Sequence, residues 1–338
     1  MTKIEAARQD YTKWCNAIGI STLKDLDKLL QAGQAIPLIN ICEARQERNY
    51  AEAADRIFSG RKKKRIVMMS GPSSSGKTSS SWRIAQQMAT LGVFPNVIEL
   101  DDYFVDRENT PKDKDGHYDF ECLGAMDVKG LNRDLRDLLD GKEVILPKFD
   151  FKEGRGVRDG SRRMRLGKGE VLFMEGIHAL NPALTPEIDR KDIYNIYISA
   201  LSSLKGGRKV HGSTTDKRLM RRIVRDNRVR GIDPEENILR WPSVRRGETI
   251  NIFPFEENAD MVLNTSTLYD IPVLKYYAEP LLWGIKEGSP AYDKAQSIIS
   301  FCESVTALKP AEIAAIPPTS IMREFIGGQS KLGIKLQG

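Results

Sequence analysis

The stretch RIVMMSGPSSSGKTSSSWRIA, residues 65–85, decides the fold that we expect for this chain. Its centre, GPSSSGKT, fits the pattern GxxxxGK(S/T), in which glycines let the backbone turn so that successive N–H groups point at phosphate oxygens. The pattern follows an apolar segment and precedes a helix-length one, whose positive N-terminal end would add to the attraction. We therefore predict a nucleotide-phosphate loop rather than an ordinary Ser/Gly turn.

The side chains of this loop have separate predicted roles. Lys77 would reach the β and γ phosphates and the Thr78 hydroxyl would ligate Mg²⁺, whereas the serines after Thr78 mainly begin a helix. The phosphate-binding residues that we expect are Gly71, Ser73, Ser74, Ser75, Gly76, Lys77, Thr78 and Ser79. GTPases, motors and small-molecule kinases share such a loop, so it does not identify the reaction. The chain has no guanine-reading NKxD motif, which disfavours a GTPase.

Short apolar runs separated by helix-length segments continue along the chain: RIVMMS, NVIELDD, EVILP, EVLFMEG and NIYISA. Runs of this kind are typical of buried parallel strands joined by crossover helices. We therefore predict a P-loop NTPase of the α/β class, with a doubly wound parallel sheet flanked by helices. Ligands bind at the carboxyl ends of such strands, so the residues just after each run are the candidates for a site.

The chain divides into three predicted parts. Residues 1–60 carry apolar residues at helical spacing and are expected to form an N-terminal helical appendage. Residues 61–310 are the predicted phosphate-loop domain, with an arginine-rich insertion or lid at about 201–258. Residues 311–338 are expected to form a C-terminal tail that packs back on the domain.

Composition places the 338 residues among ordinary globular proteins, with 40% hydrophobic and 29% charged residues. No apolar run approaches the roughly 18 residues that span a bilayer. The N-terminus lacks the apolar core of a signal peptide. We therefore expect a cytoplasmic protein without a membrane partner. The four cysteines are far apart and lack metal or disulfide spacing, so we expect free thiols.

The formal charge of +6 suits anionic ligands but is too weak to predict a nucleic-acid partner. The run RKKKR, residues 61–65, is interpreted as a solvated linker before a strand, with a nucleic-acid or targeting patch as the alternative. The sequence leaves open whether the protein forms a homo-oligomer.

Two acidic positions are predicted at the carboxyl edge of the sheet. The segment LDDYFVDR places Asp101 and Asp102 after a strand, where a carboxylate can orient a hydroxyl and accept its proton, or hold Mg²⁺ through water. One acid would face the site and the other would cap a helix, the alternative being two solvated loop residues. Glu175 ends the run EVLFME and would hold the magnesium water shell, unless it pairs with a surface lysine. The predicted metal residues are Thr78, Glu175 and Asp101.

The stretch TTDKRLMRRIVRDNRVRG, residues 214–231, is dense in arginine. Its arginines at helical spacing are Arg218, Arg221, Arg222 and Arg225, beside an apolar stripe of Leu219, Ile223 and Val224. Like charges four residues apart repel each other on a surface helix. A triphosphate would neutralise them, and guanidinium groups suit phosphate oxygens. We interpret the stretch as a lid over the transferred phosphate, with a helix that docks on acidic partners as the alternative.

With these residues in place, residues 65 to about 290 resemble the uridine kinase and phosphoribulokinase family of P-loop kinases. The motifs that carry the resemblance are, in order, GPSSSGKT, LDDYFVDRENTPKDKDGHYDFECLGAMD, LPKFDF, VLFMEGIHALNP, STTDKRLMRRIVRD and WPSVRRGETINIFPFEENAD. The last three are especially similar to a bacterial uridine kinase or nucleoside kinase branch. Longer members of that branch resemble threonyl-tRNA synthetase in parts that residues 1–60 do not show, so we expect a short member or a fragment.

The resemblance implies roles for individual residues. The family's general base falls on Asp101 in DDYF, and Glu121 stands where an aspartate touches the ribose hydroxyls. Lid arginines of the family fall on Arg222, Arg225 and Arg230, the last as part of the nucleotide site. The residues implied to act in transfer are Asp101, Lys77, Arg222 and Arg225. The residues implied around the acceptor are Asp102, Tyr103, Tyr118, Glu121, Phe149, Asp150, Arg155 and His178.

The sequence departs from the family where uridine kinases read the base. Phe149 replaces a base-contacting tyrosine, and Gly154 stands where a base-reading histidine is expected. His178 or His117 would have to supply the missing imidazole, unless both are structural. Because a site without its hydrogen-bonding partner loses discrimination, the resemblance implies kinase chemistry more firmly than a uridine preference.

Together these features predict a kinase that uses ATP and Mg²⁺ to phosphorylate the 5′-hydroxyl of a nucleoside. Two alternatives stay open. One is a kinase of another sugar or sugar phosphate, and the other is a non-catalytic protein that senses nucleotides or binds RNA.

Overall fold

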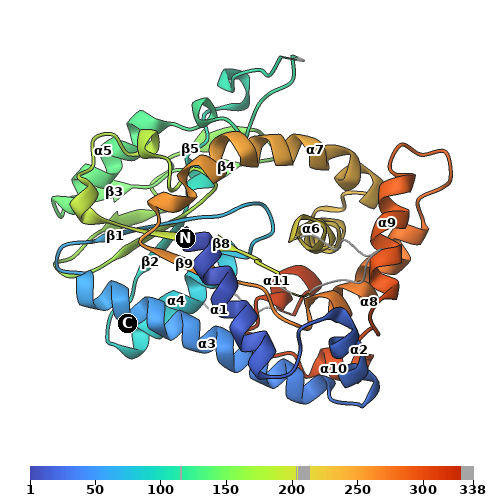
Figure 1. Cartoon of the computed structure of the whole chain (residues 1–338). Helices are drawn as coiled ribbons and strands as arrows, with labels where there is room; N and C mark the ends of the chain where they lie inside the picture. Colours follow the sequence, from blue (N-terminus) through green and yellow to red (C-terminus); the bar gives the residue numbers. More distant parts are fainter. Residues whose placement is uncertain (115, 203, 205–213, 329–338) are drawn as a thin grey trace.

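The computed structural model describes residues 1–114, 116–202, 204 and 214–328. Five parallel strands form the main sheet in the order β2-β7-β1-β8-β9 (Figure 1). The strands are β1 (Ile66–Ser70), β2 (Asn96–Glu99), β7 (Leu172–Glu175), β8 (Ile193–Ser199) and β9 (Met261–Asn264). Central β1 pairs on both sides, with Met69 opposite Glu175 of β7 and Ile196 of β8. The predicted parallel sheet flanked by helices is confirmed.

Both faces of the sheet are covered, which explains why its strands are continuously apolar. Ile66 and Met68 of β1 belong to one buried cluster, which includes apolar residues of α5. Val67 and Met69 point to the other face and join a cluster with residues of α3 and α4. All five residues of β1 are buried.

Helices surround the sheet and extend away from one of its edges (Figure 1). They are α1 (Lys3–Ala17), α2 (Leu23–Gln31), α3 (Ala35–Gly60), α4 (Lys77–Thr90), α5 (Val128–Leu139), α6 (Thr214–Arg230), α7 (Pro234–Asn251), α8 (Asp270–Trp283), α9 (Tyr292–Glu303), α10 (Pro310–Ala314) and α11 (Met322–Ile326). Short 3₁₀ helices are η1 (Leu100–Tyr103), η2 (Arg107–Asn109), η3 (Leu123–Ala125), η4 (Pro182–Leu184), η5 (Arg190–Asp192) and η6 (Phe253–Asn258). Thr2 and Thr22 start α1 and α2 with capping boxes.

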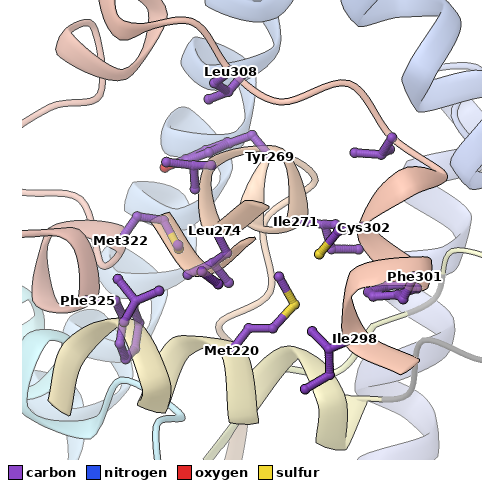
Figure 2. Packing of buried hydrophobic residues seen from close by; sticks show 14 of the residues in the cluster. Met220, Tyr269, Ile271, Leu274, Ile298, Phe301, Cys302, Leu308, Met322 and Phe325 are labelled. Atoms are coloured by element: carbon purple, nitrogen blue, oxygen red, sulfur yellow. The ribbon is translucent and has the colours of Figure 1, made fainter. Parts of the chain in front are cut away.

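A third buried cluster joins helices from both ends of the chain. Figure 2 shows part of it, where Met220 of α6 lies near Leu274 of α8 and Phe325 of α11. The predicted apolar stripe of α6 is buried in this cluster. Residues of α1, α2 and the first half of α3 belong to the same cluster, and α3 also packs on α4. The division at residue 60 stays a prediction.

The prediction that the run EVILP forms a strand of the main sheet was wrong. Its residues form β3 (Glu143–Ile145), which pairs antiparallel with β6 (Arg163–Arg165), beside a second small hairpin of β4 (Lys148–Asp150) and β5 (Arg155–Val157). Only Val144 of β3 is buried, so this strand has one covered face rather than two. The fifth strand of the main sheet is β9, which follows the arginine-rich stretch and was not predicted.

Parts of two predicted regions lie outside the described residues: 203 and 205–213 of the lid, and 329–338 of the tail. In the described part of the tail Met322 and Phe325 are fully buried, and the division at residue 311 stays a prediction. All four cysteines are free thiols. Among the described residues, we find no helix that combines the length and the apolar character needed to cross a bilayer.

Candidate active site

The loop between β1 and α4 owes its shape to glycines and serines. Ser74 (φ 58°) and Gly76 (φ 88°) have left-handed backbones, and such positions turn successive N–H groups toward an anion. A Cβ on Gly71 would lie 2.2 Å from the carbonyl oxygen of Ile198 on β8, so only glycine fits there. The hydroxyls of Ser74 and Ser75 are buried without a hydrogen-bond partner among the described residues. The turned amides and unpaired hydroxyls fit a phosphate group.

Lys77, the first residue of α4, lies among the charges of the site. Its Nζ donates to the carbonyl oxygen of Gly71 at 2.9 Å. Burial raises the pKa of Asp101, Glu121 and Glu175, and the Lys77 ammonium acts to lower it in each case. Three acids from separate segments are therefore within electrostatic range of one lysine.

Glu175 and Thr78 meet where β7 and the phosphate loop lie side by side. The Thr78 hydroxyl donates to Glu175 Oε1 at 2.5 Å. Glu175 is 6% exposed, and burial raises its pKa to about 7, although Lys77 and Thr78 oppose the shift. A carboxylate and a hydroxyl are oxygen ligands of the kind that Mg²⁺ takes.

Replacement of Glu175 by glutamine should stabilise the protein at high pH. A pKa of about 7 in the folded state, against the 4.5 of an ordinary glutamate, means that folding favours the protonated acid. That contribution to stability is present at low pH and is lost as the pH rises through 7, at a cost of up to roughly 3 kcal/mol. Urea unfolding without Mg²⁺ or nucleotide should therefore show Glu175→Gln more stable than wild type at pH 8, and much less so at pH 5.

Glu99→Gln is the matched control, because Glu99 is exposed at the same edge of the sheet. It should change the free energy of unfolding little at either pH. A Glu175→Gln effect that is equal at pH 5 and pH 8 would contradict the raised pKa.

Asp101 and Asp102 both lie in η1 after β2, but their surroundings differ. Asp102 forms a salt bridge with Arg162 at 2.5 Å and accepts the backbone N–H of Phe149 at 3.3 Å. It therefore ties the end of β2 to the β4 hairpin. Asp101 has its pKa raised by burial, with Lys77 as the main opposing charge. Asp101 therefore lies within electrostatic range of the phosphate-loop lysine.

Glu121 lies against α7, and His178 lies near the backbone of Glu121 and Cys122. A Cβ on Gly247 of α7 would lie 2.8 Å from the Cβ of Glu121, so the two segments are in close contact. Burial raises the pKa of Glu121 to about 7, against the effect of Arg222. His178 is buried, and burial lowers its pKa to about 4, so its imidazole is neutral at pH 7.

Two predicted acceptor residues are engaged elsewhere. Tyr103 is buried in the cluster under α5, and its hydroxyl donates to Asp134 at 3.1 Å. Asp150 is exposed and caps the turn after β4, where it accepts the N–H groups of Lys152 at 2.9 Å and Glu153 at 3.1 Å. These hydrogen bonds lower the pKa of Asp150.

The β4 hairpin and the segment before it form an aromatic wall beside η1. The buried ring of Phe149 contacts Phe104 and Phe151, with centroids 5.7 and 5.1 Å away. Tyr118 and Arg155 are exposed. Gly154 has a left-handed backbone (φ 71°), and a Cβ there would lie 2.7 Å from Nε of Arg107. An arginine therefore occupies the space next to the position where the family places a histidine.

The three arginines that the resemblance assigns to the lid share one acidic partner. Asp226, which is buried, pairs with Arg222 at 3.4 Å, Arg225 at 2.8 Å and Arg230 at 3.4 Å. Arg222 also donates to the hydroxyl of Ser73 at 2.9 Å. This places α6 directly against the phosphate loop.

Two more arginines of the stretch, Arg218 and Arg221, are buried inside the protein. Arg218 pairs with Glu248 of α7, and Arg221 pairs with Asp270 of α8 at 2.7 Å. Acids of the chain itself therefore compensate these guanidinium groups, and α6 belongs to the core as well as to the site.

Three residues that touch the loop were not singled out from the sequence. Glu248 accepts the N–H of Ser73 at 2.9 Å, Thr265 donates its hydroxyl to the carbonyl of Ser75 at 2.6 Å, and Glu324 accepts from Ser79. Glu248 lies in the motif VRRGETIN, which was noted for its resemblance only. A contact across such long stretches of chain leaves no local spacing that could reveal it.

The site suits Mg²⁺ held together with phosphates better than a metal held by protein alone. Within the described ranges, no three His, Cys, Asp or Glu side chains form a metal cage. Mg²⁺ usually binds through one or two carboxylates plus substrate phosphates and water. Thr78, Glu175 and Asp101 fit that pattern beside the phosphate loop.

Comparison with known proteins points to one family. The family model "PRK: Phosphoribulokinase / Uridine kinase family" matches residues 66–272. A uridine kinase of Mycoplasma genitalium is 30% identical over 200 residues, 59% of this chain and 84% of that protein. Inorganic pyrophosphatase TTM2 of Arabidopsis thaliana is 31% identical over 173 residues, 51% of this chain but only 21% of that protein. A solved structure described as a possible uridine kinase from Bacillus stearothermophilus has a TM-score of 0.39 and 17% identity, covering 60% of this chain and 89% of that one.

Proposed function

The chain belongs to the phosphoribulokinase and uridine kinase family, and from this premise we propose that it transfers the γ-phosphate of ATP to the 5′-hydroxyl of a nucleoside. The observation that carries the proposal is the placement of Asp101, Glu121 and Glu175 around Lys77 at the carboxyl edge of the sheet. Phosphoryl transfer needs a phosphate loop together with a carboxylate that positions the attacking hydroxyl.

Each side chain of this arrangement has a distinct role in the proposal. The loop amides and Lys77 bind the β and γ phosphates, and Thr78 with Glu175 orients Mg²⁺, which supplies charge neutralisation when bound. Asp101 orients the acceptor hydroxyl and takes its proton. Glu121 holds the sugar hydroxyls. Asp150 has no part in this scheme, because its carboxylate caps a turn.

The lid arginines complete the proposed site. Arg222 touches the loop at Ser73, and Arg225 and Arg230 share the Asp226 carboxylate with it. Guanidinium groups in this position would stabilise charge on the transferred phosphoryl group. A closed α6 would also exclude water and so limit hydrolysis of ATP.

A panel of acceptors tests this proposal. Purified protein with ATP and Mg²⁺ is offered nucleosides and pentose phosphates separately, and mass spectrometry reads an increase of one phosphate. We expect a nucleoside monophosphate as product, with weak discrimination between bases because Phe149 and Gly154 present no base-reading polar side chain. A reaction without acceptor is included, because one relative is named an inorganic pyrophosphatase.

Two outcomes would contradict the nucleoside assignment: phosphorylation of pentose phosphates alone, or hydrolysis without any transfer. A strong preference for uridine would keep the kinase assignment and show that a residue other than Phe149 and Gly154 reads the base.

A sugar phosphate is the second candidate acceptor, and one observation favours it. The guanidinium of Arg107 packs against Gly154, close to the hairpin that carries Phe149. Arginine binds phosphate oxygens well, whereas a nucleoside carries no phosphate. Phosphorylation of a pentose phosphate that is lost in Arg107→Met, with nucleosides inert, would establish this alternative.

A further inference from the structure

The described end of the chain lies across the start of α4. Glu324 of α11 accepts the Ser79 hydroxyl at 2.6 Å and the Ser79 N–H at 3.4 Å, both through Oε2. Next to it, the side chain of Ile321 covers Gly76, since a Cβ on that glycine would lie 2.2 Å from Ile321 Cδ1. A carboxylate and an apolar side chain thus cover the helix side of the phosphate loop.

The Ser79 N–H is a donor that an anion would use. It lies in the first turn of α4, where the helix dipole favours negative charge. Phosphates bind to N–H groups in this position. The hydroxyls of Ser74 and Ser75, buried at 4% and 0% exposure, have no partner among the described residues. Glu324 therefore stands where part of a phosphate chain would be bound.

The backbone that carries Glu324 is firmly held. Met322 and Phe325, on either side of it, are both fully buried and lie in the core with Met220 of α6 (Figure 2). Arg228 of α6 donates to the backbone carbonyls of Glu324 at 3.0 Å and Phe325 at 3.1 Å. The Glu324 side chain itself is partly exposed, so a ligand could displace its carboxylate without unfolding α11.

A second carboxylate also contacts the loop, and salt bridges hold it in place. Glu248 accepts the N–H of Ser73 but is 1% exposed and forms salt bridges with both Arg218 and Arg245. In the described part of the chain Glu324 forms no salt bridge and is partly exposed. Glu324 is therefore the displaceable carboxylate of the two.

We propose that Glu324 is a built-in competitor of the nucleotide phosphates, so that the C-terminal helix α11 weakens nucleotide binding. The proposal rests on the proposed function, because it requires the loop to bind a nucleotide. The competing carboxylate satisfies Ser79 in the free protein, and a bound phosphate has to displace it and overcome its negative charge.

Glu324→Gln tests the proposal, since the amide keeps the shape and removes the charge. Isothermal titration with MgATP, in the absence of an acceptor, should give a Kd about fivefold to tenfold lower than that of wild type. Glu324→Asp keeps the charge but shortens the reach to Ser79, and should give a Kd between the two. Glu287→Gln is the control, because Glu287 is exposed between α8 and α9 and its change should leave the Kd unaltered.

Lys77→Ala separates failure of this inference from failure of the proposed function. If wild type binds MgATP and Lys77→Ala weakens it, the loop is a nucleotide site. A Kd of Glu324→Gln within twofold of wild type, or higher than wild type, would then overturn the competition. If neither wild type nor Glu324→Gln binds MgATP, the proposed function itself fails. Circular dichroism melts show whether each variant is folded, and Glu324→Asp decides the matter should the glutamine variant be unfolded.

Discussion

Asp101→Asn is expected to lower kcat for phosphoryl transfer by about a thousandfold while MgATP binds with a Kd close to that of wild type. A positioned general base contributes about 10² to 10⁴ in rate. Asparagine keeps the size of the side chain but cannot accept the proton of the acceptor hydroxyl. The loop donors and Lys77, which hold the phosphates in our proposal, are unchanged. Steady-state kinetics with the best acceptor, together with titration of MgATP, measure both quantities.

Glu99→Gln is the matched control for this variant. Glu99 ends β2, two residues before Asp101, and its carboxylate is exposed. Its removal takes away a negative charge that helps to raise the pKa of Asp101, so kcat should change by no more than a few-fold. An Asp101→Asn variant with kcat within tenfold of wild type would remove Asp101 as the base. A large loss of MgATP binding would instead indicate a role in holding the metal.

The core of the fold could be predicted because its signals are local. The run RIVMMS, the loop GPSSSGKT and the helix after it are consecutive in the chain, and each is typical of its structure. The run EVILP led to a wrong prediction because an apolar run does not indicate how many faces of the strand are covered. Only Val144 of β3 is buried, and the strand pairs in a small hairpin. Strand β9, whose run is MVLN, was not among the apolar runs that we singled out, because it follows directly on the stretch interpreted as a lid.

The acids of the site could be located for the same reason. Asp101 and Glu175 follow or end strands, and the carboxyl ends of parallel strands meet at one edge. The partners of these acids could not be located. Whether Asp101 or Asp102 faces Lys77 depends on Arg162, sixty residues further along the chain, which pairs with Asp102. No spacing within LDDYFVDR contains that information.

The arginine-rich stretch shows most clearly what could not be predicted from the sequence. Helical spacing indicates that its arginines cannot all share one face, but it does not say what each one meets. Arg222 donates to the Ser73 hydroxyl, whereas Arg218 and Arg221 are buried against Glu248 and Asp270 and reach only backbone carbonyls of the loop. Adjacent arginines on one helix therefore serve the site and the core, and only tertiary packing distinguishes them.

Asp270→Asn is expected to cause the largest loss of stability of any single carboxylate-to-amide change that we propose. Asp270 is fully buried at the start of α8 and pairs with Arg221 at 2.7 Å and Lys217 at 3.0 Å. Burial acts to raise its pKa, but the two cations overcome this and hold it below the usual value. Without the carboxylate, two buried cations face each other unpaired, which should cost about 3 to 5 kcal/mol in the free energy of unfolding. Urea unfolding at pH 7 measures this loss.

Two further variants test whether the loss of stability comes from the unpaired buried charges. Glu52→Gln breaks an exposed pair with Arg56 on α3 and should cost less than about 1 kcal/mol. Lys217→Met added to Asp270→Asn removes one of the two unpaired cations, so the double variant should be more stable than Asp270→Asn alone. A loss below about 1 kcal/mol for Asp270→Asn, or a double variant that is less stable still, would contradict this account. Because Arg221, the partner of Asp270, donates to the carbonyl of Ser74 at 3.4 Å, we also expect Asp270→Asn to weaken nucleotide binding through Arg221.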